Sequence, residues 1–400
     1  MKQFLEEHTY DIRKTGNGRW IDQKCTMDEL CFVADCVVNY LDEGGCEPFK
    51  SPNIWHAEYS IKNVMELFSK PDPTDKTTID EYNKFFRQPL KMLSAAGVLS
   101  ERKVGSEIQF RVENRDILNY LSLNERNCMD FLCSYIEKTL KDSGIWDYFA
   151  SFFDEQTKER YQEVKQAFHE FCIKYTPINN SAEPGRIFAK VINPLAVKYK
   201  KKGSERGHIS SKIITLDKIK YNQPNTIRDK DKEKNVSRQQ AKLDPNTTTV
   251  NASYNYQVTK AMNRLRKYND KVNASRSEVT DKFSIGSVAT HMHHIFPKSS
   301  FPSIADYVEN LIALTSAQHM QEAHPNGNTQ VIDKDFQYLC LICKTESIRR
   351  NLMYGLGSSN FYSFDNFMTV LDTGFNSTFF VGLSQNDYNS VISGIEMNYK

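Results

Sequence analysis

A dense cluster of histidines marks the part of the chain where chemistry could occur. Residues 291–324 hold five of the nine histidines in this 400-residue sequence, namely His291, His293, His294, His319 and His324. Neutral imidazole binds divalent cations, and its unperturbed pKa of about 6.5 suits proton transfer near neutral pH. Packing preference alone does not readily explain such a cluster, so it indicates a site for chemistry. The alternative is a histidine-lined core or surface without chemistry.

Two short strands and a helix would bring these imidazoles together. The segment 288–296 can form a strand that ends at Pro297, because proline cannot continue a central ladder. The segment 310–315 is a second predicted strand, and Ser316 is the expected N-cap of a helix through 320–323. Such an arrangement holds imidazoles from the first strand and the helix close to one another.

The order and spacing of four polar residues carry a resemblance. A His-His pair, His293 and His294, ends the first predicted strand, Asn310 opens an Asn-Leu-x-x-Leu segment, and His319 follows Asn310 by nine residues. This pattern resembles the His-Asn-His (HNH) nuclease family, which has the ββα-metal fold. Adjacent strand residues point to opposite faces, so either the backbone bends at the histidine pair or its two side chains do different jobs.

The resemblance implies a role for each of these residues. His293 and His319 would be metal ligands, and His294 would be the general base that deprotonates water. Asn310 would fix the loop so that His294 presents the correct nitrogen. The implied cofactor is Mg²⁺ or another divalent cation such as Mn²⁺, which can neutralise charge that develops on the phosphodiester during hydrolysis.

Two further features bear on metal binding. Many family members carry another ligand four residues after the helix histidine, where this chain has Ala323. His324 is one position later, which on an α-helix is about 140° from His319, so its role as a third ligand stays open. Cys340 and Cys343 form a single pair, and a structural zinc there would need two more ligands.

The first 120 residues show helical patterns followed by a basic hairpin. Apolar residues recur at helical spacing over 27–41, and a second helix is expected to start at Ser60. A third helical stretch over 79–96 should be divided into two pieces by Pro89. The segment 101–112 indicates two short strands around a Gly-Ser turn.

This order resembles a winged helix-turn-helix, in which the second helix of the motif enters the major groove and the wing touches the backbone. The resemblance places these basic side chains on DNA: Lys84, Arg87, Lys91, Arg102 and Lys103. The alternative is a small α+β module with a protein-binding role.

A small net charge hides a strong local asymmetry. The chain carries a formal charge of +2, yet Arg186 to Lys242 contains 16 Lys and Arg against 5 Asp and Glu. This surplus predicts either a surface for a polyanion or a solvated basic loop. Its densest part could clamp the DNA backbone through Lys200, Lys201, Lys202 and Arg206.

Composition and cysteine content limit the classes of protein to which the chain can belong. With 39% hydrophobic and 26% charged residues the chain is typical of soluble globular proteins, and no apolar run approaches a membrane span. Nine cysteines are an odd number without a disulfide framework, and the N-terminus lacks the pattern of a signal peptide. These features predict a cytoplasmic protein.

We therefore expect an α+β multidomain chain. A winged-helix-like domain would span 1–120, a helical connector with an aromatic core 121–180, and a basic DNA-contacting segment with its linker 181–249. The HNH nuclease domain would span 250–400 and begin with a helix over 252–273.

The expected function is that of a type II restriction endonuclease acting on double-stranded DNA. The segments 186–196, 309–312 and 323–328 resemble stretches of bacterial type II enzymes of the HNH class, some of which (type IIS) cut at a distance from an asymmetric site. A cognate DNA methyltransferase is the implied functional partner, and cutting both strands requires a homodimer or sequential nicking. The alternatives are a nonspecific homing or defence nuclease, and a winged-helix regulator whose histidines hold structural zinc.

Overall fold

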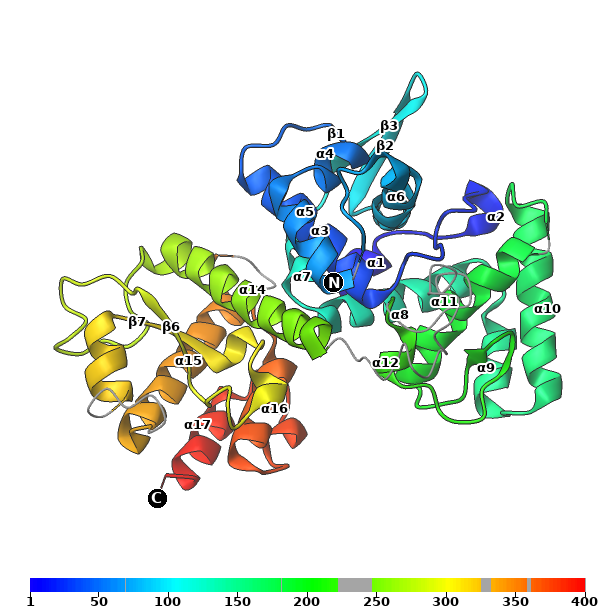
Figure 1. The fold of residues 1–400 in the computed structure, drawn as a ribbon. Helices are drawn as coiled ribbons and strands as arrows, with labels where there is room; N and C mark the ends of the chain where they lie inside the picture. Colours follow the sequence, from blue (N-terminus) through cyan, green and yellow to red (C-terminus); the bar gives the residue numbers. More distant parts are fainter. Residues whose placement is uncertain (69, 181, 222–246, 325–331, 358–360, 400) are drawn as a thin grey trace. The chain divides into compact units, whose positions relative to one another are not determined.

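The chain divides into two compact units, residues 1–250 and residues 251–400. The computed structural model describes 1–68, 70–180, 182–221, 247–324, 332–357 and 361–399 (Figure 1). Most of the predicted linker over 229–249 and the segment 325–328 of the restriction-enzyme resemblance lie outside the described residues. The two units combine many helices with three small sheets, which confirms a mixed α+β class.

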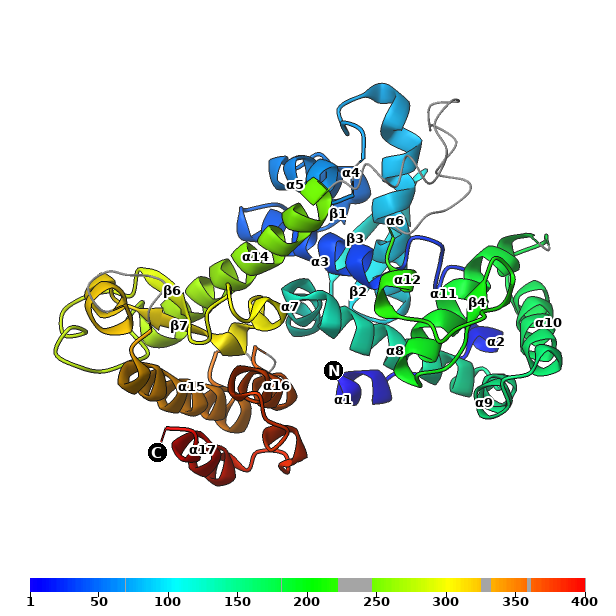
Figure 2. The ribbon, with the colours of Figure 1, turned by 60° about the horizontal axis from the view of Figure 1, so that its bottom comes forward.

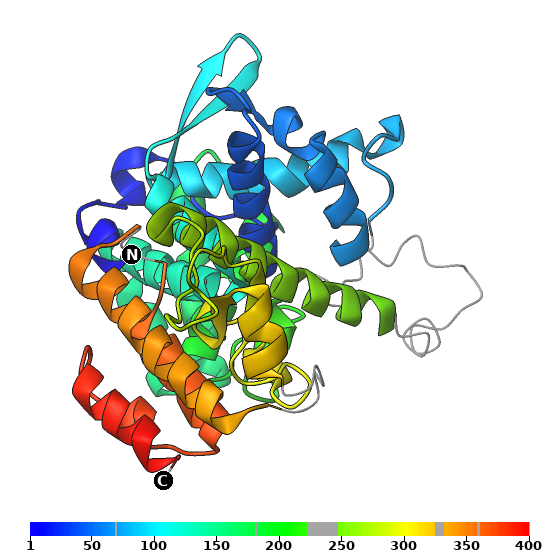
Figure 3. The same ribbon diagram turned by 90° about the vertical axis from the view of Figure 1, so that its left-hand side faces the viewer.

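The first unit opens with helices and a three-stranded antiparallel sheet. Up to residue 112 its elements are α1 (Lys2–Glu6), α2 (Ile12–Thr15), α3 (Met27–Asp42), β1 (Phe49–Lys50), α4 (Ser51–Trp55), α5 (Glu58–Phe68), α6 (Ile79–Ala95), β2 (Leu99–Val104) and β3 (Glu107–Val112). The strands lie in the order β1-β3-β2, with Phe49 opposite Phe110 and Leu99 opposite Val112. The β2–β3 hairpin, in cyan, extends beyond the helices of this unit (Figure 3).

Two predictions about these helices are wrong. Helix α5 begins before Ser60, because the Ala57 carbonyl already accepts the amide of Ile61 at 3.0 Å. Helix α6 continues through Pro89. An interior proline costs about 3 kcal/mol, but Phe85 and Leu90 on its two sides are both fully buried, and each such side chain stabilises by about 1.5–3 kcal/mol. Packing on both sides of the proline therefore keeps one continuous helix.

Helices dominate the rest of the first unit. They are α7 (Arg115–Leu123), α8 (Glu125–Asp142), α9 (Trp146–Asp154), α10 (Lys158–Tyr175), α11 (Ala182–Lys198) and α12 (Leu216–Ile219), with a small hairpin of β4 (Ser204–Glu205) and β5 (His208–Ile209). The aromatic core predicted for the connector is confirmed, since Phe131, Phe149 and Phe168 are fully buried.

The second unit surrounds a two-stranded sheet with helices. Its elements are α14 (Thr247–Asn273), β6 (His291–His294), β7 (Leu311–Leu314), a wide helical turn (Gln318–Ala323), α15 (Lys334–Tyr354), α16 (Phe364–Phe375) and α17 (Tyr388–Met397). Every residue of β7 is buried, which makes this strand the centre of the core. A Cβ atom on Gly374 would overlap the ring of Phe296, so glycine lets α16 pack closely on the end of β6.

A buried ion pair ties the loop before β6 to α15. The side chains of Glu278 and Lys344 are 2% and 0% exposed, and the Lys344 ammonium donates to the two carboxylate oxygens at 2.9 and 2.8 Å. Tyr362 accepts a third bond from Lys344 at 3.0 Å, and the Ala313 amide of β7 donates to Glu278 at 2.9 Å. Each charge is therefore compensated by hydrogen bonds as well as by its partner.

None of the described helices combines the length and the apolar character required to cross a lipid bilayer. The nine cysteines, all within the described ranges, are thiols and form no disulfides.

Replacing Lys344 with Met should destabilise the second unit strongly. The substitution leaves the carboxylate of Glu278 buried without its cation, which typically costs about 3–5 kcal/mol. Trp20, Trp55 and Trp146 all lie in the first unit, so amide hydrogen exchange in β7 and α15 is the appropriate measurement. We expect roughly 10²- to 10⁴-fold faster exchange of the slowest amides there.

Arg349→Met is the matched control, since Arg349 pairs with Glu346 at 3.8 Å on the surface, where such pairs contribute about 1 kcal/mol or less. Equal effects of the two substitutions would show that the buried pair has no special role.

Candidate metal centre

The strand β6 sends its two consecutive histidines to different places. It is shorter than predicted, covering four residues, and pairs with β7 so that His293 lies opposite Ile312 and His294 opposite Leu311. His293 is 6% exposed and points toward the wide helical turn, whereas His294 contacts the loop that precedes β7. The side chains of His293 and His294 therefore lie in different surroundings, as expected for adjacent residues of a regular strand.

Thr315, and not the predicted Ser316, caps the helix that carries the other imidazoles. The Thr315 hydroxyl accepts from the Gln318 amide at 3.2 Å, and the Gln318 side-chain oxygen accepts from the Thr315 amide at 3.0 Å. This reciprocal pair is a capping box, and its Thr-x-x-Gln spacing is visible in the sequence. Gln318 also donates to Val279 and accepts from Ser277, so the start of this helix is fixed to the loop before β6.

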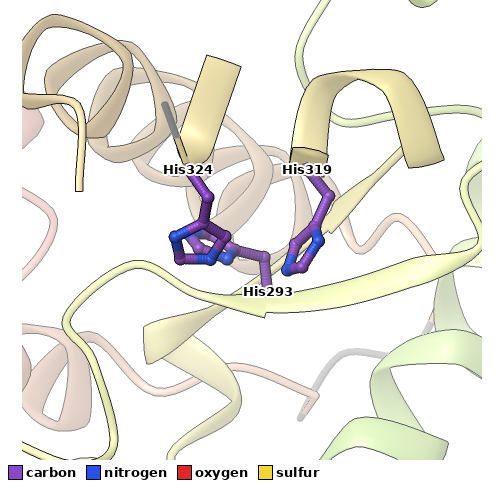
Figure 4. Close-up of side chains that lie close together, drawn as sticks. All are labelled: His293, His319 and His324. Atoms are coloured by element: carbon purple, nitrogen blue, oxygen red, sulfur yellow. The ribbon is translucent and has the colours of Figure 1, made fainter. Parts of the chain in front are cut away.

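The expected angular separation of His319 and His324 is wrong, because Gln318–Ala323 is a π-helical turn rather than α-helical. Hydrogen bonds in a π-helix run from residue i to residue i+5, so residues five apart lie near one another. The ring centroids of His319 and His324 are 4.9 Å apart, and that of His293 lies 5.2 and 5.1 Å from them. Figure 4 shows the three rings converging from β6 and from the turn.

These three residues can hold a metal ion. One nitrogen from each of His293, His319 and His324 lies within 4.8 Å of the other two, the one such group found among the described residues. Nitrogens that share a tetrahedral zinc ion at about 2.0–2.1 Å are about 3.4 Å apart, so the rings need to approach by up to about 1.4 Å. Nδ1 of His319 is buried without a hydrogen-bond partner. Leaving a buried polar atom unpaired costs free energy of folding, and a ligand bound to this nitrogen would remove that cost.

The electrostatics of the cluster favour the metal-binding form of imidazole. Burial, reinforced by the neighbouring histidines, lowers the pKa of His293 to about 3 and that of His319 to about 4. Both rings are therefore neutral near pH 7 and offer a lone pair to a cation. His291 stacks on His319, with ring centroids 4.6 Å apart, but does not belong to the group of three.

One ring nitrogen of His294 is committed to the backbone. Its Nε2 lies 3.0 Å from the Ala305 carbonyl oxygen, and a carbonyl can only accept, so Nε2 carries the hydrogen. In the neutral ring Nδ1 then holds the lone pair. Burial lowers the pKa of His294, the bond to Ala305 acts in the opposite direction, and Lys298 lowers it further. The ring is therefore neutral near pH 7 and able to accept a proton.

Asn310 holds the loop that fixes this ring. The residue is fully buried, its side-chain oxygen accepts from the Phe296 amide at 2.9 Å, and its amide group donates to the Phe296 and Ile304 carbonyls at 3.0 and 3.2 Å. Because Ile304 precedes Ala305, these bonds position the carbonyl that His294 contacts. The predicted orienting role of Asn310 is compatible with this geometry.

Sequence reasoning missed Gln337, which braces the same turn from α15. Its side-chain amide donates to the Ile295 carbonyl at 2.7 Å, and its oxygen accepts from the Tyr399 hydroxyl at 2.8 Å. The residue is separated from His294 by more than forty positions in the chain, so no local pattern indicates the contact. Cys340 and Cys343 lie on α15, and no third potential ligand joins them in the described part of the chain.

The basic residues predicted to contact DNA lie in the first unit and differ in accessibility. Lys84 and Arg87 on α6 are exposed, whereas Lys91 pairs with Glu101 at 3.3 Å. Arg102 and Lys103 are exposed on β2. Lys200 and Arg206 are exposed, while Lys201 and Lys202 are partly buried at the base of the β4–β5 hairpin.

The comparisons with known proteins leave the family open. No protein-family model matches the chain, and neither a curated protein nor a solved structure does so.

Replacing His324 with Ala should weaken zinc binding by at least 100-fold, because it removes one of three ligands. Isothermal titration of the full chain with Zn²⁺ measures this, with one high-affinity site expected in the unchanged protein. His291→Ala is the matched control: it removes an adjacent imidazole that stacks on the site, and we expect an affinity within about threefold of the original. Equal losses in both variants would contradict the assigned ligand set.

Proposed function

We propose that the chain is a metal-dependent DNA endonuclease of the HNH class. The observation that carries the proposal is the convergence of His293, His319 and His324 within 4.8 Å, together with a neutral imidazole, His294, which follows His293 on β6 and has one nitrogen committed to a carbonyl. A ligand set and an adjacent base are the two parts that metal-assisted phosphodiester hydrolysis requires.

The roles follow from the positions of the side chains. Nδ1 of His294 would take a proton from the attacking water, and Asn310 and Gln337 would keep the ring oriented through the backbone on either side of it. His293, His319 and His324 would hold the cation, which when bound supplies a positive charge next to the scissile phosphate.

The donor set favours a particular kind of metal. Three neutral imidazole nitrogens suit Zn²⁺ and other transition metals, whereas Mg²⁺ prefers oxygen ligands and water. We therefore propose a transition metal such as zinc as the resident ion. The expectation of Mg²⁺ or Mn²⁺ stays a prediction, and activity in each metal decides between them.

An open coordination position favours an enzyme over the alternative of a regulator with structural zinc. Structural zinc sites are closed by four protein ligands, while catalytic sites use three and leave one position for water or substrate. The described residues supply three ligands, and His319 remains partly accessible to solvent.

We further propose that the first unit binds duplex DNA and makes cleavage site-specific, as in a type II restriction enzyme. Helix α6 leads directly into the β2–β3 hairpin, and Lys84, Arg87, Arg102 and Lys103 are exposed on these two elements. This arrangement supports the winged-helix interpretation. A cytoplasmic location, a cognate methyltransferase and a homodimer on DNA belong to the same proposal, and a nonspecific nuclease is its nearest competitor.

His294→Ala should reduce cleavage of plasmid DNA by about 10²- to 10⁴-fold, the usual contribution of a positioned base. Zinc affinity should stay within a few-fold, because His294 is not in the ligand group. His56→Ala, which replaces an exposed histidine of the other unit, is the control and should cut normally.

The DNA fragments produced and the metal ions that support cleavage distinguish the remaining alternatives. Discrete fragments from several plasmids support site recognition, and a smear supports the nonspecific nuclease. Unchanged cleavage by His294→Ala contradicts the assigned base. Failure of the original protein to cut any DNA with Zn²⁺, Mn²⁺, Mg²⁺ or Ni²⁺ contradicts the nuclease and favours the regulator.

Lys84→Ala and Arg87→Ala should each weaken DNA binding and lower the slope of log affinity against log salt by about one, because each removes a phosphate contact. Lys91→Ala should have a smaller effect, since Glu101 already compensates that charge. Fluorescence anisotropy with a labelled duplex over a range of salt concentrations measures both quantities. Lys2→Ala is the control, and equal slopes in all variants would remove α6 from the interface.

A further inference from the structure

The β4–β5 hairpin of the first unit is anchored by side chains of the helices around it. Asn193 of α11 accepts the Ser204 amide at 2.6 Å and donates to the Ser204 carbonyl at 2.9 Å, so one side chain replaces a strand partner. Gln156, between α9 and α10, accepts the Lys202 amide at 2.5 Å. Figure 2 shows β4 beside α11.

The base of the hairpin is closely packed around Gly203. A Cβ atom on Gly203 would overlap the side chain of Asn193 and lie 2.9 Å from Ile214 and 3.1 Å from Ala196. The Ser204 hydroxyl is buried 2.8 Å from the Tyr161 hydroxyl of α10. A hairpin with two-residue strands is unstable by itself, so its conformation depends on these contacts.

The tip of the hairpin places an arginine in an unfavourable backbone conformation. Arg206 and Gly207 have φ values of 52° and 81°, in the left-handed region that Gly and Asn adopt most easily. Lys165 donates to the Gly207 carbonyl at 2.8 Å and so fixes the turn from α10. Arg206 is exposed, and among the described residues no carboxylate pairs with it, whereas neighbouring Glu205 pairs with Lys218 at 3.7 Å.

We propose that Arg206 reads a base edge in duplex DNA, with guanine preferred, while Lys200, Lys201 and Lys202 contact phosphates. The inference rests on the proposed function in that its ligand is DNA. The guanidinium can donate two parallel bonds to O6 and N7 of guanine, but only from a fixed position. The rigid base and the strained tip provide such a position. A phosphate contact would require neither, because a flexible ammonium on any loop suffices.

The experiment selects bound duplexes from a random-sequence library with metal-free full-length protein, so that binding is separated from cleavage. The original protein should enrich guanine at one position. Arg206→Lys keeps the charge but removes the planar fork, and the guanine preference should fall by at least fivefold. Lys200→Ala should weaken binding to all sequences alike and lower the salt slope by about one.

Two variants test the role of rigidity. Asn193→Leu removes both bonds to Ser204 without changing any charge, and we expect a weaker base preference at nearly unchanged average affinity. Arg206→Asn should lose the preference while its thermal midpoint equals or exceeds the original, because Asn fits this φ better. Circular dichroism shows whether each variant folds, and Gln156→Leu replaces Asn193→Leu if the latter does not.

The outcomes separate this inference from the nuclease proposal. A guanine preference that survives Arg206→Lys, an equal loss of affinity for all sequences, or no DNA binding would overturn the role of Arg206. Selective binding that depends on Arg206 in a protein that never cuts DNA would uphold it and contradict only the nuclease.

Discussion

The candidate site depends on the hydrogen-bond spacing of one short helical turn. On an α-helix, His319 and His324 would face different directions, and only a two-ligand site would remain. The π-helical turn over Gln318–Ala323 brings both rings opposite His293 on β6. Such turns are rare and occur frequently at functional sites, because they present side chains that an α-helix cannot bring together. The capping box of Thr315 and Gln318 fixes where this turn begins.

Three buried polar side chains fix the backbone around the candidate site. A buried donor or acceptor without a partner is costly, so each bond that Asn310, Gln318 and Gln337 make also fixes the backbone they contact. Asn310 and Gln337 hold the turn after His294, and Gln318 holds the helix before His319. The candidate base and the candidate ligands are therefore oriented by separate side chains around one small sheet.

The sequence pointed to two members of the candidate ligand group, and where it differs from the structure the difference has a physical cause. The resemblance to the HNH family singled out His293, His294, Asn310 and His319, and the structure brings His293 and His319 into one potential ligand group. The role of His324 stayed open because five residues on an α-helix would place it about 140° from His319. Contacts between distant segments, such as Gln337 with Ile295, leave no local pattern. Pro89 remained inside α6 because tertiary packing outweighed local propensity, and the identities of both domains stay predictions.

X-ray absorption at the zinc edge of the metal-loaded full-length protein tests the central claim most directly, since it reports the atoms bound to the ion. We predict three imidazole nitrogens at about 2.0–2.1 Å with one oxygen from water, and the loss of one imidazole in His324→Ala. Sulfur in the first shell, or a shell of oxygen alone, would contradict the assignment of His293, His319 and His324 as the metal centre.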